Sequence, residues 1–125
     1  MILGTGIDLC EVERIRDSIT RFGDHFLQRV FTEPEIRYCK SKKNSAERFA
    51  ARFAAKEAAM KALGTGWSRG VRWTELEVAH APGGRPTLRL HGSSSEIAEQ
   101  LGVKRISLSV THTEQTAMAM VIFED

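Results

Sequence analysis

The sequence predicts a single small α+β domain, in which a mostly antiparallel sheet packs against a long central helix. After a short first strand, apolar residues recur at the 3.6-residue period of amphipathic helices up to about residue 63. After residue 66 they recur at the two-residue period of strands, with turn residues between the segments. At 125 residues the chain is long enough to bury one core without disulfides or a structural metal. We therefore expect residues 1–125 to form one domain.

A short strand over residues 2–8 opens the chain and ends at the acidic Asp8. Its glycines indicate either bending or the close approach of another backbone. The helix that follows has an apolar stripe at helical spacing, made of Val12, Ile15, Ile19 and Phe22. Arg14 and Arg21 lie seven residues apart on its opposite face. Such a pair either is merely solvated or meets an anionic partner.

A second helix is expected from Thr32 to about Cys39. Thr32 is a good N-cap, Pro34 falls near the first turn, and Glu35 stands three residues after Thr32, as in a capping box. Residues 40–45 form a polar, basic loop that leads into the next helix. This loop either is solvated or is placed to meet a phosphate.

The central helix is alanine-rich over residues 53–63, with favourable propensity and no proline. Gly64 stands where a helix C-cap belongs, and residues 64–66 open a tight turn with exposed backbone. Glu57 and Lys61 are four residues apart and so share one face of this helix.

Arg52 and Lys56 form a basic row about 100° around the central helix from Glu57 and Lys61. A carboxylate and an ammonium beside a basic row and a glycine turn suit a divalent metal and a polyphosphate. The simpler alternative is an ordinary surface ion pair between Glu57 and Lys61, worth a few tenths of a kcal/mol.

Four strands and one helix are expected after residue 66. Residues 73–81 and 86–91 form a hairpin around Pro82-Gly-Gly-Arg85, and residues 93–101 form a serine-capped helix closed by Gly102. A second hairpin joins residues 105–112 to residues 116–123. Both faces of the last strand are apolar, as in a sheet covered on each side or at a subunit contact.

Composition and charge exclude several classes of protein. The hydrophobic fraction of 42 % and charged fraction of 27 % are those of a globular chain, and no apolar run reaches the length of a transmembrane helix. The N-terminus lacks the basic start of a signal peptide, and Cys10 and Cys39 have no metal-ligand or disulfide-framework spacing. These features predict a cytoplasmic protein with two free thiols and no membrane partner.

The net charge of +2 hides an excess of four positive charges within residues 11–61. This excess suggests an anionic partner for the helical half. A nucleic-acid-binding domain is one alternative, but the sequence has no recognisable DNA- or RNA-binding motif and no aromatics interleaved with the basic residues. We therefore expect no nucleic-acid partner.

Three separate segments offer chemistry: Asp8, the Glu57–Lys61 face, and residues 109–113, which contain His112. Mg²⁺ prefers a few carboxylates together with waters and substrate phosphates, so Asp8 and Glu57 are a plausible pair. Composition and periodicity alone do not unite these groups, because a lone aspartate at a strand end is usually a turn residue.

The exact sequence motifs connect these three segments. Residues 6–15, 52–66, 84–86 and 109–113 read GIDLCEVERI, RFAAKEAAMKALGTG, GRP and SVTHT. Together they closely resemble the bacterial holo-[acyl-carrier-protein] synthase family, the short type of 4′-phosphopantetheinyl transferase, along essentially the whole chain. The resemblance implies the 4′-phosphopantetheinyl transferase fold. It also implies the transfer of 4′-phosphopantetheine from coenzyme A to a serine of apo acyl carrier protein, in fatty acid biosynthesis. Adenosine 3′,5′-bisphosphate would leave.

The resemblance also implies catalytic roles. Asp8 and Glu57 match the family's Mg²⁺ ligands, and Lys61 matches the lysine that contacts the pyrophosphate. The base that takes the serine proton stays open between Glu57, a metal-bound water or hydroxide, and a water held by Asp8.

A larger set matches coenzyme A contacts in the family, and Lys42 and Lys43 are looser candidates for the 3′-phosphate. The set consists of Arg52, Lys61, Gly64, Thr65, Gly66, Gly84, Pro86, His112 and Thr113.

Arg14 and Arg21 match helix positions that meet the acidic recognition helix of the carrier protein. The family further implies a homotrimer with active sites between subunits. The alternative function is a non-catalytic coenzyme A or nucleotide-binding module that uses the same pocket.

Overall fold

The structure is a computed structural model, and it describes residues 1–66 and 69–125. The elements follow one another as β1 (Ile2–Glu11), α1 (Val12–Phe22), α2 (Asp24–Val30), α3 (Glu33–Lys40), α4 (Ser45–Leu63), the single 3₁₀ turn η1 (Trp73–Glu75), β2 (Leu76–His80), β3 (Pro86–Leu90), α5 (Gly92–Leu101), β4 (Arg105–His112) and β5 (Thr116–Glu124).

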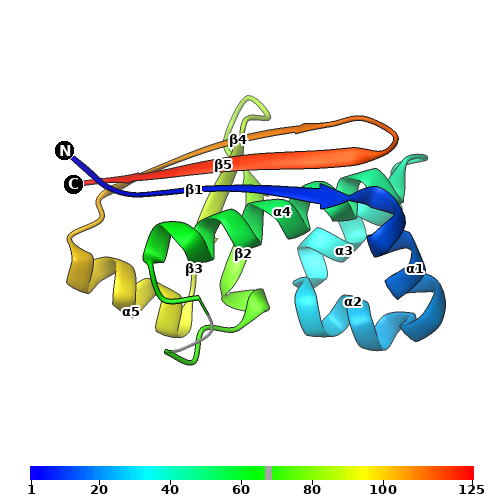
Figure 1. Cartoon of the computed structure of the whole chain (residues 1–125), viewed down its shortest axis with the longest axis horizontal. Coiled ribbons are helices and arrows are strands. Elements are labelled where there is room, and N and C mark those ends of the chain that lie inside the picture. The colour runs from blue at the N-terminus through cyan, green and yellow to red at the C-terminus, as the bar shows by residue number, and fades with distance from the viewer. Residues whose placement is uncertain (67–68) are drawn as a thin grey trace.

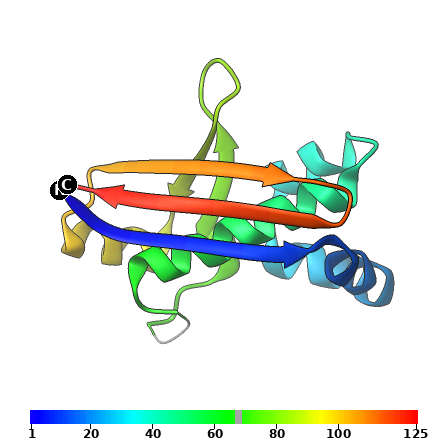
Figure 2. The same cartoon turned by 45° about the horizontal axis from the view of Figure 1, so that its top comes forward.

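A three-stranded antiparallel sheet in the order β1-β5-β4 lies along α4 (Figures 1 and 2). Strands β2 and β3 form a separate antiparallel pair. Helices α1, α2 and α3 gather at one end of α4, and α5 lies near the other end (Figure 1). The predicted α+β fold with a long central helix is confirmed, although the strands form two sheets.

The core is centred on α4, whose small side chains let neighbouring elements approach closely. Alanines at positions 50, 54, 55, 58 and 59 are fully buried, and the inward residues of β5, from Ala117 to Phe123, pack against them. At Gly6 an added Cβ would overlap the Ala58 carbonyl, and at Gly4 it would overlap the Ala62 carbonyl. Of the two readings of the first strand's glycines, close backbone approach is confirmed.

Several predicted boundaries shift. The first strand extends to Glu11, the central helix begins at Ser45, and the α5 N-cap is His91, with no side-chain cap bond from a serine. The capping box of Thr32 and Glu35 is confirmed, and so is Gly64 as a left-handed C-cap. Helix α2 was not predicted.

Residues 73–75 were expected to begin a strand, but they form η1. The reason is the Glu75 carboxylate, which accepts hydrogen bonds from the backbone N–H of Arg72 and of Ser93, at 2.9 and 3.0 Å. These bonds hold the chain in a turn before β2 starts at Leu76.

In the part of the chain that the structure describes, no helix is long and apolar enough to cross a membrane.

Candidate active site

The packing of β1 on α4 brings Asp8 close to the central helix. Asp8 follows Gly6 by two residues, so its side chain points to the same face of β1 that contacts α4. Lys61 Nζ lies 3.0 Å from Asp8 Oδ1 and donates to the Ile7 carbonyl at 2.9 Å. Lys61 therefore pairs with Asp8, and the alternative of an ordinary surface ion pair between Glu57 and Lys61 is not what the structure shows.

Glu57 is the second carboxylate of this cluster. Burial raises the pKa of Glu57, and the nearby Asp8 raises it further, while the charges of Arg14 and Lys61 act in the opposite direction. Asp8 and Glu57 are thus close enough to repel each other when both are ionised. A divalent cation relieves this repulsion, so the donor set fits Mg²⁺.

The two carboxylates do not form a complete metal cage. Within residues 1–66 and 69–125, no three His, Cys, Asp or Glu side chains come together as a metal-binding group. This suits Mg²⁺, which usually takes one or two protein carboxylates and completes its shell with waters and substrate phosphates.

An open cavity of about 400 Å³ adjoins this pair, and we call it the metal-side cavity. It is lined by Glu57, Met60, Lys61, Gly64, Gly66 and Trp73. The cavity combines a carboxylate and an ammonium with glycines that have no side chain to obstruct a ligand. Thr65 does not line it, and its hydroxyl donates to the Gly66 carbonyl at 3.3 Å.

A second, more enclosed cavity of about 220 Å³ lies elsewhere along α4, and we call it the arginine pocket. Its lining consists of Tyr38, Arg48, Ala51, Arg52, Val78, His80, Gly84, Pro86, Val110 and His112. Four residues predicted to bind coenzyme A meet here, although they come from three distant segments of the sequence. Sequence reasoning missed Tyr38, Arg48 and His80, since no motif marks them.

Arg52 carries the strongest sign of an anionic ligand. It is only 6 % exposed, its guanidinium lies 4.4 Å above the Tyr38 ring, and its Nε has no hydrogen-bond partner among the described residues. Unsatisfied buried donors are rare in proteins and call for an explanation. An anion in the pocket supplies one.

The His80 ring stacks on the Tyr38 ring, with the two ring centroids 4.7 Å apart. Partial burial lowers the pKa of His80, and the positive charges of Arg52, Arg48 and Lys42 lower it further. The local field is therefore positive, as an anion site requires.

His112 is oriented by Glu47, whose Oε1 lies 3.0 Å from His112 Nδ1. Because a carboxylate only accepts, Nδ1 carries the proton and Nε2 is left for another contact. The Thr113 hydroxyl instead organises the β4–β5 turn, where it accepts from the backbone N–H of Gln115 and of Thr116. Thr113 therefore does not line the arginine pocket.

The two loop lysines separate. Lys42 Nζ lies 5.2 Å from the Tyr38 ring, next to the arginine pocket. Lys43 lines a different open groove together with Glu11, Glu13 and Glu47. Lys42 is therefore the better placed of the two for a phosphate.

Lys56 does not belong to a basic row beside Arg52, and that prediction is wrong. Its side chain is fully buried and ion-paired with Glu35. The helical period alone had placed it next to Arg52, whereas the packing of α3 against α4 covers this face.

The metal-side cavity and the arginine pocket do not meet within one chain. Asp8 lies on β1 and His112 on β4, with β5 between them, so the strands are about 10 Å apart. Arg52 and Lys61 are nine residues apart, about two and a half turns, and so lie on opposite sides of α4. One chain thus carries two separate cavities.

Arg14 and Arg21 are both exposed on α1. The Arg14 guanidinium lies 5.8 Å from the centre of the Phe53 ring, which stacks on Trp73 at 4.8 Å. Arg21 lies over the exposed Phe22 ring at 5.4 Å. Helix α1 thus presents two exposed cations, of which Arg14 lies near Trp73 in the wall of the metal-side cavity.

Comparison with known proteins shows the family to which the chain belongs. The sequence profile of the 4′-phosphopantetheinyl transferase superfamily matches residues 4–121. The chain is 63 % identical over 125 residues to the holo-[acyl-carrier-protein] synthase of Koribacter versatilis (strain Ellin345), with 100 % of both covered.

Solved structures of holo-[acyl-carrier-protein] synthases have the same fold. The crystal structure of holo-[acyl-carrier-protein] synthase from Neisseria meningitidis superposes with a TM-score of 0.90 at 34 % identity, covering 100 % of each chain. That of the Helicobacter pylori enzyme in complex with coenzyme A gives 0.83 at 30 % identity, covering 96 % of this chain and 99 % of that one.

The chain therefore belongs to the 4′-phosphopantetheinyl transferase superfamily, and it is an enzyme of that class. Within the superfamily its relatives are the holo-[acyl-carrier-protein] synthases, as the sequence motifs predicted.

Proposed function

We propose that this chain transfers 4′-phosphopantetheine from coenzyme A to a serine of apo acyl carrier protein, with Mg²⁺, in the cytoplasmic pathway of fatty acid biosynthesis. The observation that carries the proposal is the Asp8–Glu57 pair beside Lys61, together with the buried arginine pocket on the same helix. The coenzyme A complex of the Helicobacter pylori relative supports the donor.

The reaction forms a bond between the serine oxygen and the β-phosphorus and breaks the bond from that phosphorus to the bridging oxygen. The pair of electrons leaves with adenosine 3′,5′-bisphosphate, and the serine proton passes to Glu57 or to a water held by Asp8. Bound Mg²⁺ would neutralise the pyrophosphate charge and orient its oxygens. Lys61 is 57 % exposed at its side chain, so its ammonium can also reach the leaving phosphate.

The arginine pocket is assigned to the nucleotide half of coenzyme A. Arg52 offers its unpartnered Nε to a phosphate oxygen, and His112 offers Nε2 because Glu47 holds Nδ1. Gly84 and Pro86 form a wall without long side chains. We assign Gly64, Thr65 and Gly66 to the pyrophosphate end, and Thr113 to the rim next to His112.

A homotrimer would join the metal-side cavity of one copy to the arginine pocket of the next, so that each cavity is a half-site of one shared active site. The outward face of the sheet is apolar: Ile7, Leu9, Met118 and Met120 are 57, 62, 37 and 43 % exposed. Register pairs Ile7 with Met120 and Leu9 with Met118, so the four side chains form one patch. A second copy of the chain is the occupant that we propose. Asp8 lies on β1 and His112 on β4, the two outer strands of the sheet, and a cyclic contact would bring the β1 side of one copy to the β4 side of the next.

The carrier protein is assigned to α1. Arg14 and Arg21 are exposed cations without an ion pair among the described residues. Arg14 lies close enough to Glu57 to affect its pKa, and Arg21 lies seven residues further along α1. An acidic helix of the carrier protein is complementary to them, and association should weaken with salt.

Mass spectrometry tests the proposal. Apo acyl carrier protein incubated with the enzyme, coenzyme A and Mg²⁺ should gain the mass of 4′-phosphopantetheine. Asp8→Ala and Glu57→Ala should each reduce the rate by about a hundredfold or more, because metal-assisted charge neutralisation contributes several kcal/mol. Glu99→Ala, at an exposed carboxylate on α5, should leave the rate unchanged.

A folded wild-type protein that binds coenzyme A in calorimetry yet yields no mass gain would refute the transferase. It would support the alternative of a non-catalytic coenzyme A-binding module.

A further inference from the structure

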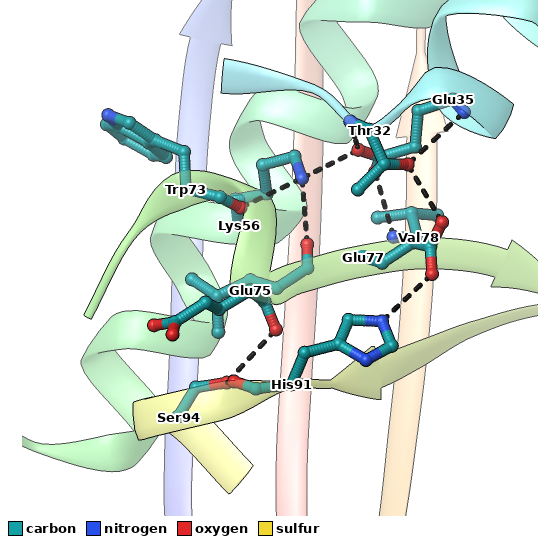
Figure 3. A network of polar contacts seen from close by, with 10 residues as sticks. Thr32, Glu35, Lys56, Trp73, Glu75, Glu77, Val78, His91 and Ser94 are labelled. Atoms are coloured by element: carbon teal, nitrogen blue, oxygen red, sulfur yellow. Dashed lines mark hydrogen bonds and ion pairs between the residues drawn. The ribbon is translucent and has the colours of Figure 1, made fainter. Parts of the chain in front are cut away.

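A buried polar network lies between α4 and the segments around it, and Lys56 is at its centre (Figure 3). The side chains of Lys56 and Glu35 are both 0 % exposed. Lys56 Nζ donates to Glu35 Oε1 at 2.8 Å, to the Trp73 carbonyl at 3.1 Å and to the Leu76 carbonyl at 2.9 Å. An ammonium has three N–H donors, so every one is used, each on a different element.

Glu35 extends the connection. Its Oε1 also accepts from the backbone N–H of Thr32, and its Oε2 accepts from that of Val78, both at 2.8 Å. The carboxylate therefore ties the start of α3 to β2. Through Lys56 the same carboxylate is tied to α4.

The network continues to a second carboxylate. Glu77 Oε2 accepts from the Thr32 hydroxyl at 2.8 Å, and Glu77 Oε1 lies 3.0 Å from His91 Nε2 (Figure 3). The network thus reaches from α3 to the start of α5, and Lys56 is its member on α4, the helix that also carries Glu57.

Trp73 connects the network to the metal-side cavity. Its carbonyl accepts from Lys56, while its ring stacks on Phe53 with centroids 4.8 Å apart and lines the cavity with Glu57 and Lys61. Lys56 precedes Glu57 directly in α4. The side chain of one residue therefore fixes the cavity wall relative to the carboxylate of the next.

A lysine at this buried position has both a cost and a specific gain. Burying an ion pair costs several kcal/mol per charge, and apolar residues of similar volume are often as stable or more so. An apolar side chain would leave the Trp73 and Leu76 carbonyls without their donor. What only the ammonium provides is the fixed distance between η1, β2 and α4.

We propose that Lys56, held by Glu35, is a positioning residue that sets the Trp73 wall of the metal-side cavity against Glu57. The proposal rests on the function proposed above. It assigns to Lys56 no contact with coenzyme A, magnesium or the carrier serine.

Kinetics of Lys56→Met test this role. We expect kcat to fall roughly ten- to a hundredfold, since small misplacements of a reacting group have effects of this size. The KM for coenzyme A should change less than kcat, staying within about twofold of wild type, because the nucleotide half is assigned to the arginine pocket, which does not include Lys56. Ile97→Ala, on the buried face of α5, is the control for lost stability. Each variant is assayed at the same number of degrees below its own Tm.

Tryptophan fluorescence gives a readout independent of activity. In a Trp67→Phe background Trp73 is the sole tryptophan. Lys56→Met should make Trp73 more accessible to acrylamide, and Ile97→Ala should not.

If Lys56→Met and Ile97→Ala lose kcat equally, or if Trp73 quenching is unchanged in Lys56→Met, the proposal is wrong. If Lys56→Met does not fold, Trp73→Leu takes its place, because Trp73 is only partly buried. That variant should lose kcat with an unchanged KM for coenzyme A, and full activity would overturn the proposal. An inactive wild type would refute the transferase function, while the quenching experiment would still test the link from Lys56 to Trp73.

Discussion

Two lysines on α4, Lys56 and Lys61, have different roles that their spacing in the sequence does not reveal. Lys56 is sealed in the interior by three acceptors, whereas Lys61 is half exposed and holds Asp8. Both are lysines on one helix, five residues apart. The difference comes from Glu35 and β2, which cover one side of α4 and leave the other open.

At this scale the motifs predicted the chemistry but not the burial. The pairing of Asp8 with Glu57 followed from matching strings, and their proximity in the structure is consistent with it. The burial of Lys56 depends on Glu35, 21 residues away on another helix, and no local pattern encodes that contact. Tyr38 and His80 were missed for the same reason, because they become a stacked pair only after folding.

His80 makes a pH-dependent contribution to stability. Its pKa lies below the ordinary 6.5 in the folded chain, because partial burial and the charges of Arg52, Arg48 and Lys42 disfavour the imidazolium. The unfolded chain therefore takes up the proton first as pH falls, and the free energy of unfolding should decrease as pH drops through about 6.5. The effect should be small, since His80 is largely solvent-accessible.

Urea denaturation between pH 7.5 and 5.5 checks this expectation, a range set by the ordinary histidine value of roughly 6.5. His80→Gln should flatten the pH dependence, while His25→Gln, at an exposed position on α2, serves as the matched histidine control. An equal slope in wild type and His80→Gln would contradict the assignment.

Among the elements, the contact of β1 with α4 determines where Asp8 lies. The strand passes so close to the helix that neither Gly4 nor Gly6 has room for a methyl group. Gly6→Ala would force the two backbones apart and should destabilise the fold by about 3 kcal/mol, the upper end of ordinary overpacking effects. Activity should fall with it, because Asp8 follows two residues later.

Equilibrium denaturation with urea measures this change. Thr5→Ala, an exposed position on the same strand, should stay within about 0.5 kcal/mol of wild type. A Gly6→Ala variant as stable as Thr5→Ala would show that β1 and α4 are not in backbone contact.

Element prediction succeeded where local chemistry dominates. The capping box of α3, the Gly64 cap and both hairpins are encoded by residues within a few positions of one another. It failed for α2, a seven-residue helix with no side-chain cap bond, and for η1, whose turn depends on the contact between Glu75 and Ser93.

Over the whole molecule, the main feature is that the metal-side cavity and the arginine pocket face away from each other. The proposal that a single coenzyme A uses both cavities therefore requires two copies of the chain. The apolar sheet face formed by Ile7, Leu9, Met118 and Met120 is the surface that we propose for this contact. The two apolar faces of the last strand predicted either a sheet covered on each side or a subunit contact. In the structure the chain itself covers only one of these faces.

Subunit complementation tests most directly whether the active site is shared between copies of the chain. Glu57→Ala should inactivate the metal-side cavity and Arg52→Ala the arginine pocket, so each variant alone, assembled as the proposed homotrimer, should transfer almost no phosphopantetheine. Coexpression in equal amounts should restore about a quarter of wild-type activity, because one interface in four then pairs two intact half-sites. A coexpressed mixture that stays as inactive as its parents, beside an active wild type, would contradict an active site shared between copies.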